Sequence, residues 1–307
     1  GWQRVQVDET GRQREPCPLG CLLGGRVLLS SNPTRLPCEA AGGGPSQPEW
    51  LLFDAGRPAA APQKLLPAWQ GEPTFNQHSY RSMAVDAARG EAILFQNADS
   101  SHAEWALRHA DGSWLSGRLA WPRYAPTDMA PFGASHARVN YPVVALKNRS
   151  VHFCGAAAYD NWDRVKTPVD LDLDGDPNAP GASGMGGRRR GNRFRRLLYA
   201  WTPAIGAEPF SAWIEIDNTF TDGGWLFATD MHVADDGTIH LLWFRSPMLP
   251  TVRDRFYPDI KRVYRIEYAT LRDGKVVTRR TLVEVGEGID KAIPTDLDQV
   301  GRPYLLD

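Results

Sequence analysis

Four side chains suited to proton transfer or carboxylate binding lie within six residues of one another: Asn76, His78, Tyr80 and Arg81. Histidine and tyrosine act as general acids or bases when their pKa values are tuned. Arginine binds a carboxylate through two parallel hydrogen bonds. The cluster therefore predicts the rim of a binding site. The alternative is a polar loop whose side chains bond to nearby backbone groups.

A strand–turn–strand pattern directly follows this cluster, in the sequence "MAVDAARGEAILF". Short apolar runs separated by Gly, Asp and Asn indicate hairpins. The same pattern occurs at 83–95, 142–154, 231–243 and 295–307, with an earlier version at 19–31. Longer hairpins lie between them, at 49–67, 104–121, 196–216 and 264–283.

A short hairpin followed by a longer one makes a four-stranded antiparallel sheet, and repetition of such a sheet is typical of a β-propeller. We therefore expect an all-β protein, with residues 1–307 forming a single propeller domain of about five blades. Residues 2–7 could complete the last blade; the alternative is that the chain forms part of a seven-bladed ring.

The propeller would place several candidate residues at equivalent positions of successive blades. His78 precedes a predicted inner strand, and His102 follows its partner strand. Arg138, Asn140 and Tyr141 precede the next inner strand. In the blade after that, Asp230 and His232 lie close to the same position. Because ligands of propellers usually meet the loops around the central channel, we expect one pocket there.

These stretches resemble a known family. "HSYRSMAVD", with "NYPVVAL" one blade later, is similar to BNR-repeat propellers such as the ulvan lyases, which cleave polysaccharides of rhamnose and uronic acid. The resemblance implies catalytic roles for His78, His102 and Tyr141. It also implies an arginine that holds the uronate carboxylate. Substrate contacts are expected from Asn76, Arg81, Arg138, Asn140 and His232.

Two other functions remain open. A glycoside hydrolase on the same scaffold would use a pair of carboxylates beside the scissile bond, and Asp99 and Asp230 are candidates. A propeller that only binds glycans or proteins would need no catalytic residue, because one fold hosts many functions.

Residues 158–196 interrupt the repeat with a long insertion. Its acidic segment "DLDLDGDPN" resembles the first half of a calcium-binding loop. We expect Ca²⁺ there, bound by Asp170, Asp172, Asp174 and Asp176; a solvated acidic turn is the alternative. The basic run "RRRGNRFRR" that follows is either a solvated face or a surface that attracts acidic sugars.

Composition narrows the remaining choices. A net charge of −1 argues against a general binder of nucleic acids or membrane surfaces, and no apolar run reaches the roughly 20 residues of a membrane-spanning helix. The acidic-polysaccharide substrate implies a secreted or periplasmic protein, which we expect to be monomeric. Cys17, Cys21 and Cys38 could form a disulfide or part of a metal site, whereas Cys154 is expected to be a buried free thiol.

Overall fold

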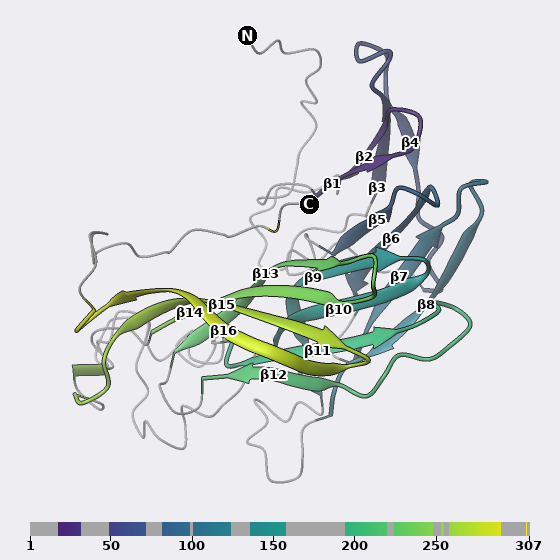
Figure 1. Ribbon diagram of the computed structural model, residues 1–307. Coiled ribbons are helices and arrows are strands. Elements are labelled where there is room, and N and C mark those ends of the chain that lie inside the picture. The colour runs from purple at the N-terminus through teal and green to yellow at the C-terminus, as the bar shows by residue number, and fades with distance from the viewer. Residues whose placement is uncertain are drawn as a thin grey trace, which may run out of the picture. The chain divides into compact units, whose positions relative to one another are not determined.

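The computed structural model is built almost entirely of β-strands (Figure 1). The described residues are 18–31, 49–71, 82–98, 101–123, 136–157, 194–219, 224–247, 253–254, 258–289 and 305. Within these ranges no helix is long and apolar enough to cross a membrane.

Sixteen strands form four sheets, each of four strands that follow one another along the chain. The first sheet contains β1 (Leu19–Leu22), β2 (Arg26–Ser31), β3 (Glu49–Asp54) and β4 (Gln63–Leu65). The second contains β5 (Met83–Asp86), β6 (Glu91–Asn97), β7 (His102–Arg108) and β8 (Trp114–Ala120). The third contains β9 (Val139–Lys147), β10 (Ser150–Ala157), β11 (Arg196–Thr202) and β12 (Ile214–Asn218). The fourth contains β13 (Trp225–Val233), β14 (Ile239–Ser246), β15 (Val263–Arg272) and β16 (Lys275–Gly286).

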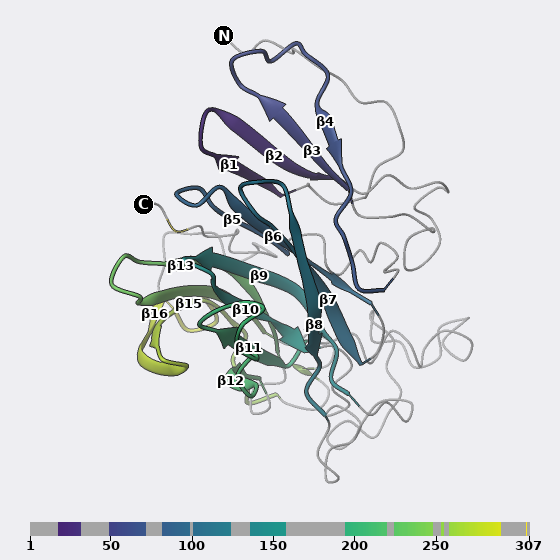
Figure 2. The ribbon, with the colours of Figure 1, turned by 90° about the vertical axis from the view of Figure 1, so that its right-hand side faces the viewer.

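The predicted architecture of four-stranded antiparallel sheets is confirmed. Each sheet consists of a short inner hairpin and a longer outer hairpin, as the sequence indicates (Figure 2). The hairpin predicted at 295–307 lies outside the described residues, apart from Leu305. The number of blades and closure into a ring stay predictions.

Two kinds of tight turn each occur twice among these hairpins. In the β9–β10 turn, the φ angles are 50° at Asn148 and 66° at Arg149. In the β15–β16 turn, they are 49° at Asp273 and 72° at Gly274. Two-residue loops with this backbone match the right-handed twist of the flanking strands. In a longer turn, Ser113 N–H and Oγ–H both donate to Asp111 Oδ1, at 2.8 and 2.6 Å.

The same longer turn occurs in the fourth sheet. There Thr238 N–H donates to Asp236 Oδ1 at 2.9 Å and its hydroxyl donates to Asp236 Oδ2 at 3.0 Å. The residue after the aspartate is Gly112 in one turn and Gly237 in the other. Their φ angles are 90° and 80°, which glycine adopts without strain. One sequence, Asp-Gly-Ser/Thr, therefore closes an outer hairpin in one sheet and an inner hairpin in another.

The chain divides into two compact units, which are described separately: residues 1–121, 141–153 and 201–211, and residues 122–140, 154–200 and 212–307. In the first unit, Phe95 packs on Phe153 at 5.0 Å between ring centroids. In the second, Phe227 packs on Phe194 at 4.8 Å and on Trp225 at 4.9 Å. Apolar side chains that alternate along the strands thus form the core.

Several tryptophans serve packing. Trp50, Trp105, Trp121 and Trp243 are at most 5% exposed. The predicted free thiol of Cys154 is confirmed: the side chain is fully buried, and burial strongly raises the pKa of the thiol. Cys21 is exposed and free, whereas Cys17 and Cys38 lie outside the described residues.

The insertion connects β10 to β11 and so lies between the inner and outer hairpins of the third sheet, as predicted. Its basic run was in part misassigned. Arg195 is only 1% exposed and donates to the Gly224 carbonyl at 2.6 Å, while Arg196 is already in β11 and pairs with Glu215. Neither arginine belongs to a free basic surface.

Candidate functional site

His102 is the predicted catalytic histidine that lies within the described residues. It begins β7, at the end of the second sheet where β5 starts, which matches the predicted position. Its Nδ1 lies 3.0 Å from Ser101 Oγ and its Nε2 lies 3.8 Å from Glu104 Oε1. Glu104 is itself buried and accepts a hydrogen bond from Gly71 N–H at 2.9 Å. The hydrogen bond with Ser101 therefore orients the ring of His102, and a buried carboxylate lies near its other nitrogen.

Tyr141 has an unusual backbone. Its φ is 50° although it lies inside β9, immediately before Pro142. A residue before proline normally has an extended backbone, and a bulky residue with positive φ is a conformational outlier. The other positive-φ residues besides glycine in the described chain are Asn148, Arg149 and Asp273, and all three are explained by two-residue hairpin turns. Tyr141 has no such explanation.

Arg138 lies just before β9, whereas Asn140 and Tyr141 lie within it, because the strand begins earlier than the sequence predicted. Asn140 is 2% exposed, and its side-chain amide donates to the Arg138 carbonyl at 3.5 Å. This hydrogen bond joins the backbone of Arg138, just before β9, to the buried side chain of Asn140 within β9. The remaining predicted residues of this group, Asn76, His78 and Arg81, lie outside the described residues, as do Asp170, Asp172, Asp174 and Asp176.

The prediction for the position of His232 was wrong. The strand β13 begins at Trp225, and His232 lies near its far end, next to the turn that leads into β14. The sequence pattern predicts that this strand starts at Met231. The observed register shift between Ala228 and Asp230 interrupts the alternation of side chains that marks a strand. His232 is thus at the opposite end of its inner hairpin from the position that Arg138 and Asn140 occupy in theirs.

His232 instead belongs to a row of side chains that crosses the fourth sheet. Its ring centroid lies 6.3 Å from that of His240 in β14. His240 Nδ1 is 2.7 Å from the hydroxyl of Tyr268 in β15, and the Arg280 guanidinium in β16 lies 5.0 Å from the centre of the Tyr268 ring. His240, Tyr268 and Arg280 were not predicted as site residues. The alternation of polar and apolar residues in "IHLLW" and "RIEYATL" is the signal that could have found them.

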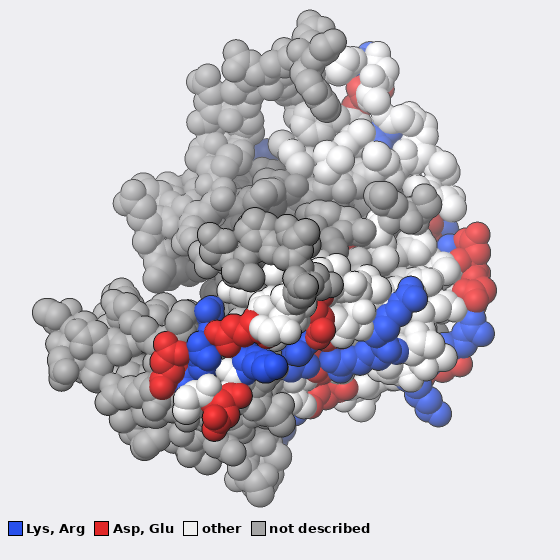
Figure 3. All heavy atoms as spheres, turned by 60° about the vertical axis from the view of Figure 1, so that its left-hand side comes forward, with Lys and Arg blue, Asp and Glu red and all other residues white. Residues whose placement is uncertain are grey.

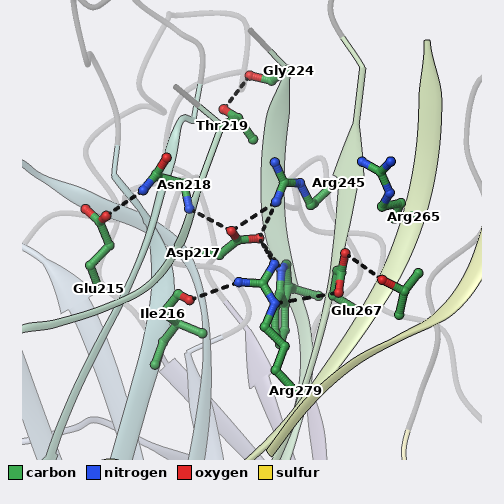
Figure 4. A network of polar contacts seen from close by, with 12 residues as sticks. Glu215, Ile216, Asp217, Asn218, Thr219, Gly224, Arg245, Arg265, Glu267 and Arg279 are labelled. Carbon is green, nitrogen blue, oxygen red and sulfur yellow. Dashed lines mark hydrogen bonds and ion pairs between the residues drawn. The ribbon is translucent and has the colours of Figure 1, made fainter. Parts of the chain in front are cut away.

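Asp217 is the centre of a buried charge network in the second unit (Figure 4). Its carboxylate accepts hydrogen bonds from Trp243 Nε1 at 2.8 Å and from Arg245 Nη1 at 3.1 Å, and Arg279 Nη2 lies 3.0 Å away. Arg279 also lies 3.7 Å from the carboxylate of Glu267 and 5.1 Å from the centre of the Trp243 ring. Both carboxylates are thereby fixed by arginine.

Another buried carboxylate, Glu91, lies in the first unit. Burial alone would raise its pKa, but hydrogen bonds from His109, Arg89 and Arg149 outweigh burial and lower the pKa. The distances are 2.8 Å to His109 Nδ1, 2.9 Å to Arg89 Nε and 3.1 Å to Arg149 Nη2. Nearby, Asp86 accepts a bond from Asn148 N–H at 2.7 Å. The cluster holds the β9–β10 turn against the second sheet, which is a structural role.

Comparison with known proteins gives no family. No known family matches the sequence, and no curated protein is similar to it. Solved structures with a similar fold include an α-L-arabinanase of Penicillium chrysogenum complexed with arabinobiose (9% identity, TM-score 0.48, 89% of this chain and 67% of that one). A family PL25 ulvan lyase bound to a glucuronate–rhamnose-3-sulfate fragment is a second (9% identity, TM-score 0.43, 85% and 56%).

A third is the GH93 α-L-arabinofuranosidase of Fusarium graminearum with arabinobiose (9% identity, TM-score 0.48, 92% of this chain and 70% of that one). The chain thus spans little more than half of the ulvan lyase and about two thirds of the two hydrolases. These structures include both a polysaccharide lyase and glycoside hydrolases. With TM-scores below 0.5, they assign no activity to this chain.

Proposed function

We propose that the protein is a carbohydrate-active enzyme that cleaves a uronate-containing acidic polysaccharide by β-elimination. The observation that carries the proposal is the backbone of Tyr141, held at φ 50° inside a strand and before a proline. Such a conformation costs on the order of 1–3 kcal/mol and persists where the surrounding structure enforces it, most often at functional sites. It indicates that the direction of the Tyr141 side chain matters more than the local cost.

The types of the candidate residues suit this reaction. Elimination next to a uronate carboxylate needs a base that removes the C5 proton, an acid that protonates the leaving oxygen, and a cation on the carboxylate. We assign proton transfer to Tyr141 and to His78, with His102 as the second histidine. Arg138 or Arg81 is assigned to the carboxylate, since a guanidinium binds it bidentately. Asn76 and Asn140 are assigned to substrate hydroxyl groups.

Two buried carboxylates of the second unit, Asp217 and Glu267, do not provide a pair for hydrolysis. A hydrolase needs two carboxyl groups that reach the scissile bond. In the described part of the chain, Asp217 and Glu267 are both buried and both lie within ion-pair distance of Arg279, so their oxygens are occupied. Asp230 accepts bonds from Met231 N–H and Leu305 N–H. Asp99, the other candidate, lies outside the described residues.

Replacing Tyr141 with phenylalanine is expected to lower turnover by about a hundredfold or more, the usual contribution of a positioned acid or base. Turnover is measured on a panel of acidic polysaccharides as new ultraviolet absorbance, which an unsaturated uronate produces, together with new reducing ends. Tyr264→Phe in β15 is the matched control, because it removes one hydroxyl from a half-buried tyrosine in a strand outside the site.

Phenylalanine keeps the ring of Tyr141, so the melting temperature of Tyr141→Phe should stay close to that of the wild type. Full activity in this variant would contradict the assignment of Tyr141. Reducing ends without new absorbance in the wild type would mean hydrolysis, and neither signal on any substrate would leave only a binding protein.

We also propose that Asp170, Asp172, Asp174 and Asp176 bind one Ca²⁺ through their side-chain oxygens. A ligand that binds only the folded state stabilises it, so calcium should raise the melting temperature relative to a chelator. The control replaces Asp172 and Asp174 with asparagine, which should remove the calcium-dependent difference. Identical melting curves of the wild type in calcium and in chelator would show that the segment is only an acidic turn.

A polysaccharide substrate of this kind is found outside the cytoplasm. We therefore propose that the protein acts in a secreted or periplasmic setting, as a monomer.

A further inference from the structure

The two faces of the fourth sheet differ in character. Successive side chains of a strand point to opposite faces. One face carries Leu241, Trp243 and Ala269, all fully buried. The pairing of β13 to β16 places His232 opposite His240, Tyr268 opposite Arg280, and Thr270 between His240 and Thr278. These six side chains share the other face, and none of them is buried.

The row His232, His240, Tyr268 and Arg280, one side chain from each strand, is connected by contacts. The Tyr268 hydroxyl and His240 Nδ1 are 2.7 Å apart, so Tyr268 is oriented from one side. On its other side, the Arg280 guanidinium lies over the ring at 5.0 Å. Beside them, the hydroxyls of Thr270 and Thr278 are 2.7 Å apart. Several side chains are thus held in place before any ligand arrives.

Arg280 differs from the other arginines of β15 and β16 in lacking a carboxylate partner among the described residues. Arg265 pairs with Glu284 at 2.6 Å, Arg272 with Asp236 at 2.7 Å, and Arg279 with Asp217 at 3.0 Å. Within the described residues, Arg280 has no carboxylate partner, and its contact is with the Tyr268 ring. Figure 3 shows Lys and Arg side chains gathered in a run along one face, with Asp and Glu side chains beside it. Among the described residues, Arg280 therefore offers a positive charge that no carboxylate neutralises.

We propose that this row binds an anionic oligosaccharide, with a carboxylate or sulfate group on Arg280 and a sugar ring against Tyr268. Aromatic faces offer apolar area together with a polar tip, and a guanidinium matches the geometry of both anions. Neighbouring strands are about 4.8 Å apart, so a row across four strands is about 14 Å long. That length fits about three sugar units. The inference concerns binding and does not depend on the proposed cleavage reaction.

Calorimetric titration of the full chain with an oligogalacturonate of about six units tests the proposal. Arg280→Ala should lower the affinity about tenfold, as expected for loss of a charge-assisted hydrogen bond. Tyr268→Leu should lower it by a similar factor. Arg272→Ala is the matched control: it removes an exposed arginine of the same sheet whose charge is already paired, and it should leave the affinity within about twofold.

Two further probes identify the chemistry. The methyl-esterified oligogalacturonate, which lacks the charges, should bind about tenfold more weakly than the acid, and a sulfated neutral oligosaccharide shows whether sulfate replaces carboxylate. Absorbance is followed in the same samples. Binding that Arg280→Ala weakens would support the row whether or not the oligogalacturonate is cleaved. Equal affinity of Arg280→Ala and the wild type, or equal binding of the acid and its ester, would overturn the proposal even if cleavage occurs.

Discussion

Replacing Asp217 with alanine is expected to lower the free energy of unfolding by about 3 to 5 kcal/mol, the cost of removing one partner from a buried ion pair. The substitution leaves the Arg245 guanidinium and the Trp243 indole N–H without the acceptor they share. Arg245 is only 13% exposed, so water cannot replace the lost carboxylate. Arg279 is 36% exposed and recovers part of its hydration, which reduces its own share of the effect.

Urea denaturation at pH 7 measures this loss. Glu215→Ala is the matched control, since Glu215 lies on the same strand β12 and pairs with Arg196 nearer the surface, with side chains 32% and 27% exposed. That pair should contribute no more than about 1 kcal/mol. If the two variants lost the same amount of stability, Asp217 would not be the centre that holds its arginines in place.

Acid is expected to destabilise the protein through His152. This histidine is 4% exposed, stacks on Trp201 with ring centroids 5.8 Å apart, and lies 2.6 Å from Ser150 Oγ through its Nε2. Burial lowers the pKa of His152 from 6.5 to about 4. Above pH 6.5 the ring is neutral in both states. Between pH 6.5 and 4 the unfolded chain binds a proton that the folded chain does not, so stability falls as the pH falls.

The full loss from this one group is about 3 kcal/mol, since one pKa unit corresponds to about 1.4 kcal/mol. Urea denaturation of the wild type and of His152→Gln across this pH range measures it. The difference in stability between the two should shrink steadily from pH 7 to pH 4, because glutamine does not titrate. Parallel curves for the two proteins would show that His152 takes up its proton without cost in the folded state.

The hairpins were predictable because their turn signals are local. Asp-Gly-Ser, Asp-Gly-Thr and Asp-Gly-Lys each mark a turn by a few adjacent residues, and apolar runs on both sides show the strands. The start of β13 was not predictable in this way. Its register shift between Ala228 and Asp230 breaks the period of two on which strand recognition depends.

The buried charges could not be predicted, because their partners lie far apart in the sequence. Asp217 meets Trp243 and Arg245 from another sheet and Arg279 from a strand still further along the chain. Arg195 belongs to a basic run in the sequence, but in the structure it is buried and donates a hydrogen bond to the Gly224 carbonyl. The backbone of Tyr141 is hidden for a different reason: the sequence shows a Tyr-Pro pair, and that pair normally indicates an extended residue.

The Asp-Gly-Ser/Thr turn has a consequence for how such a chain can lengthen in evolution. The hydrogen bonds that close the turn lie within the five residues from His109 to Ser113, and again within those from Ala234 to Thr238. A duplicated hairpin therefore carries a complete turn with it, in an outer or an inner position alike. Gene segments that encode two strands and their turn can multiply without a matching change elsewhere in the protein.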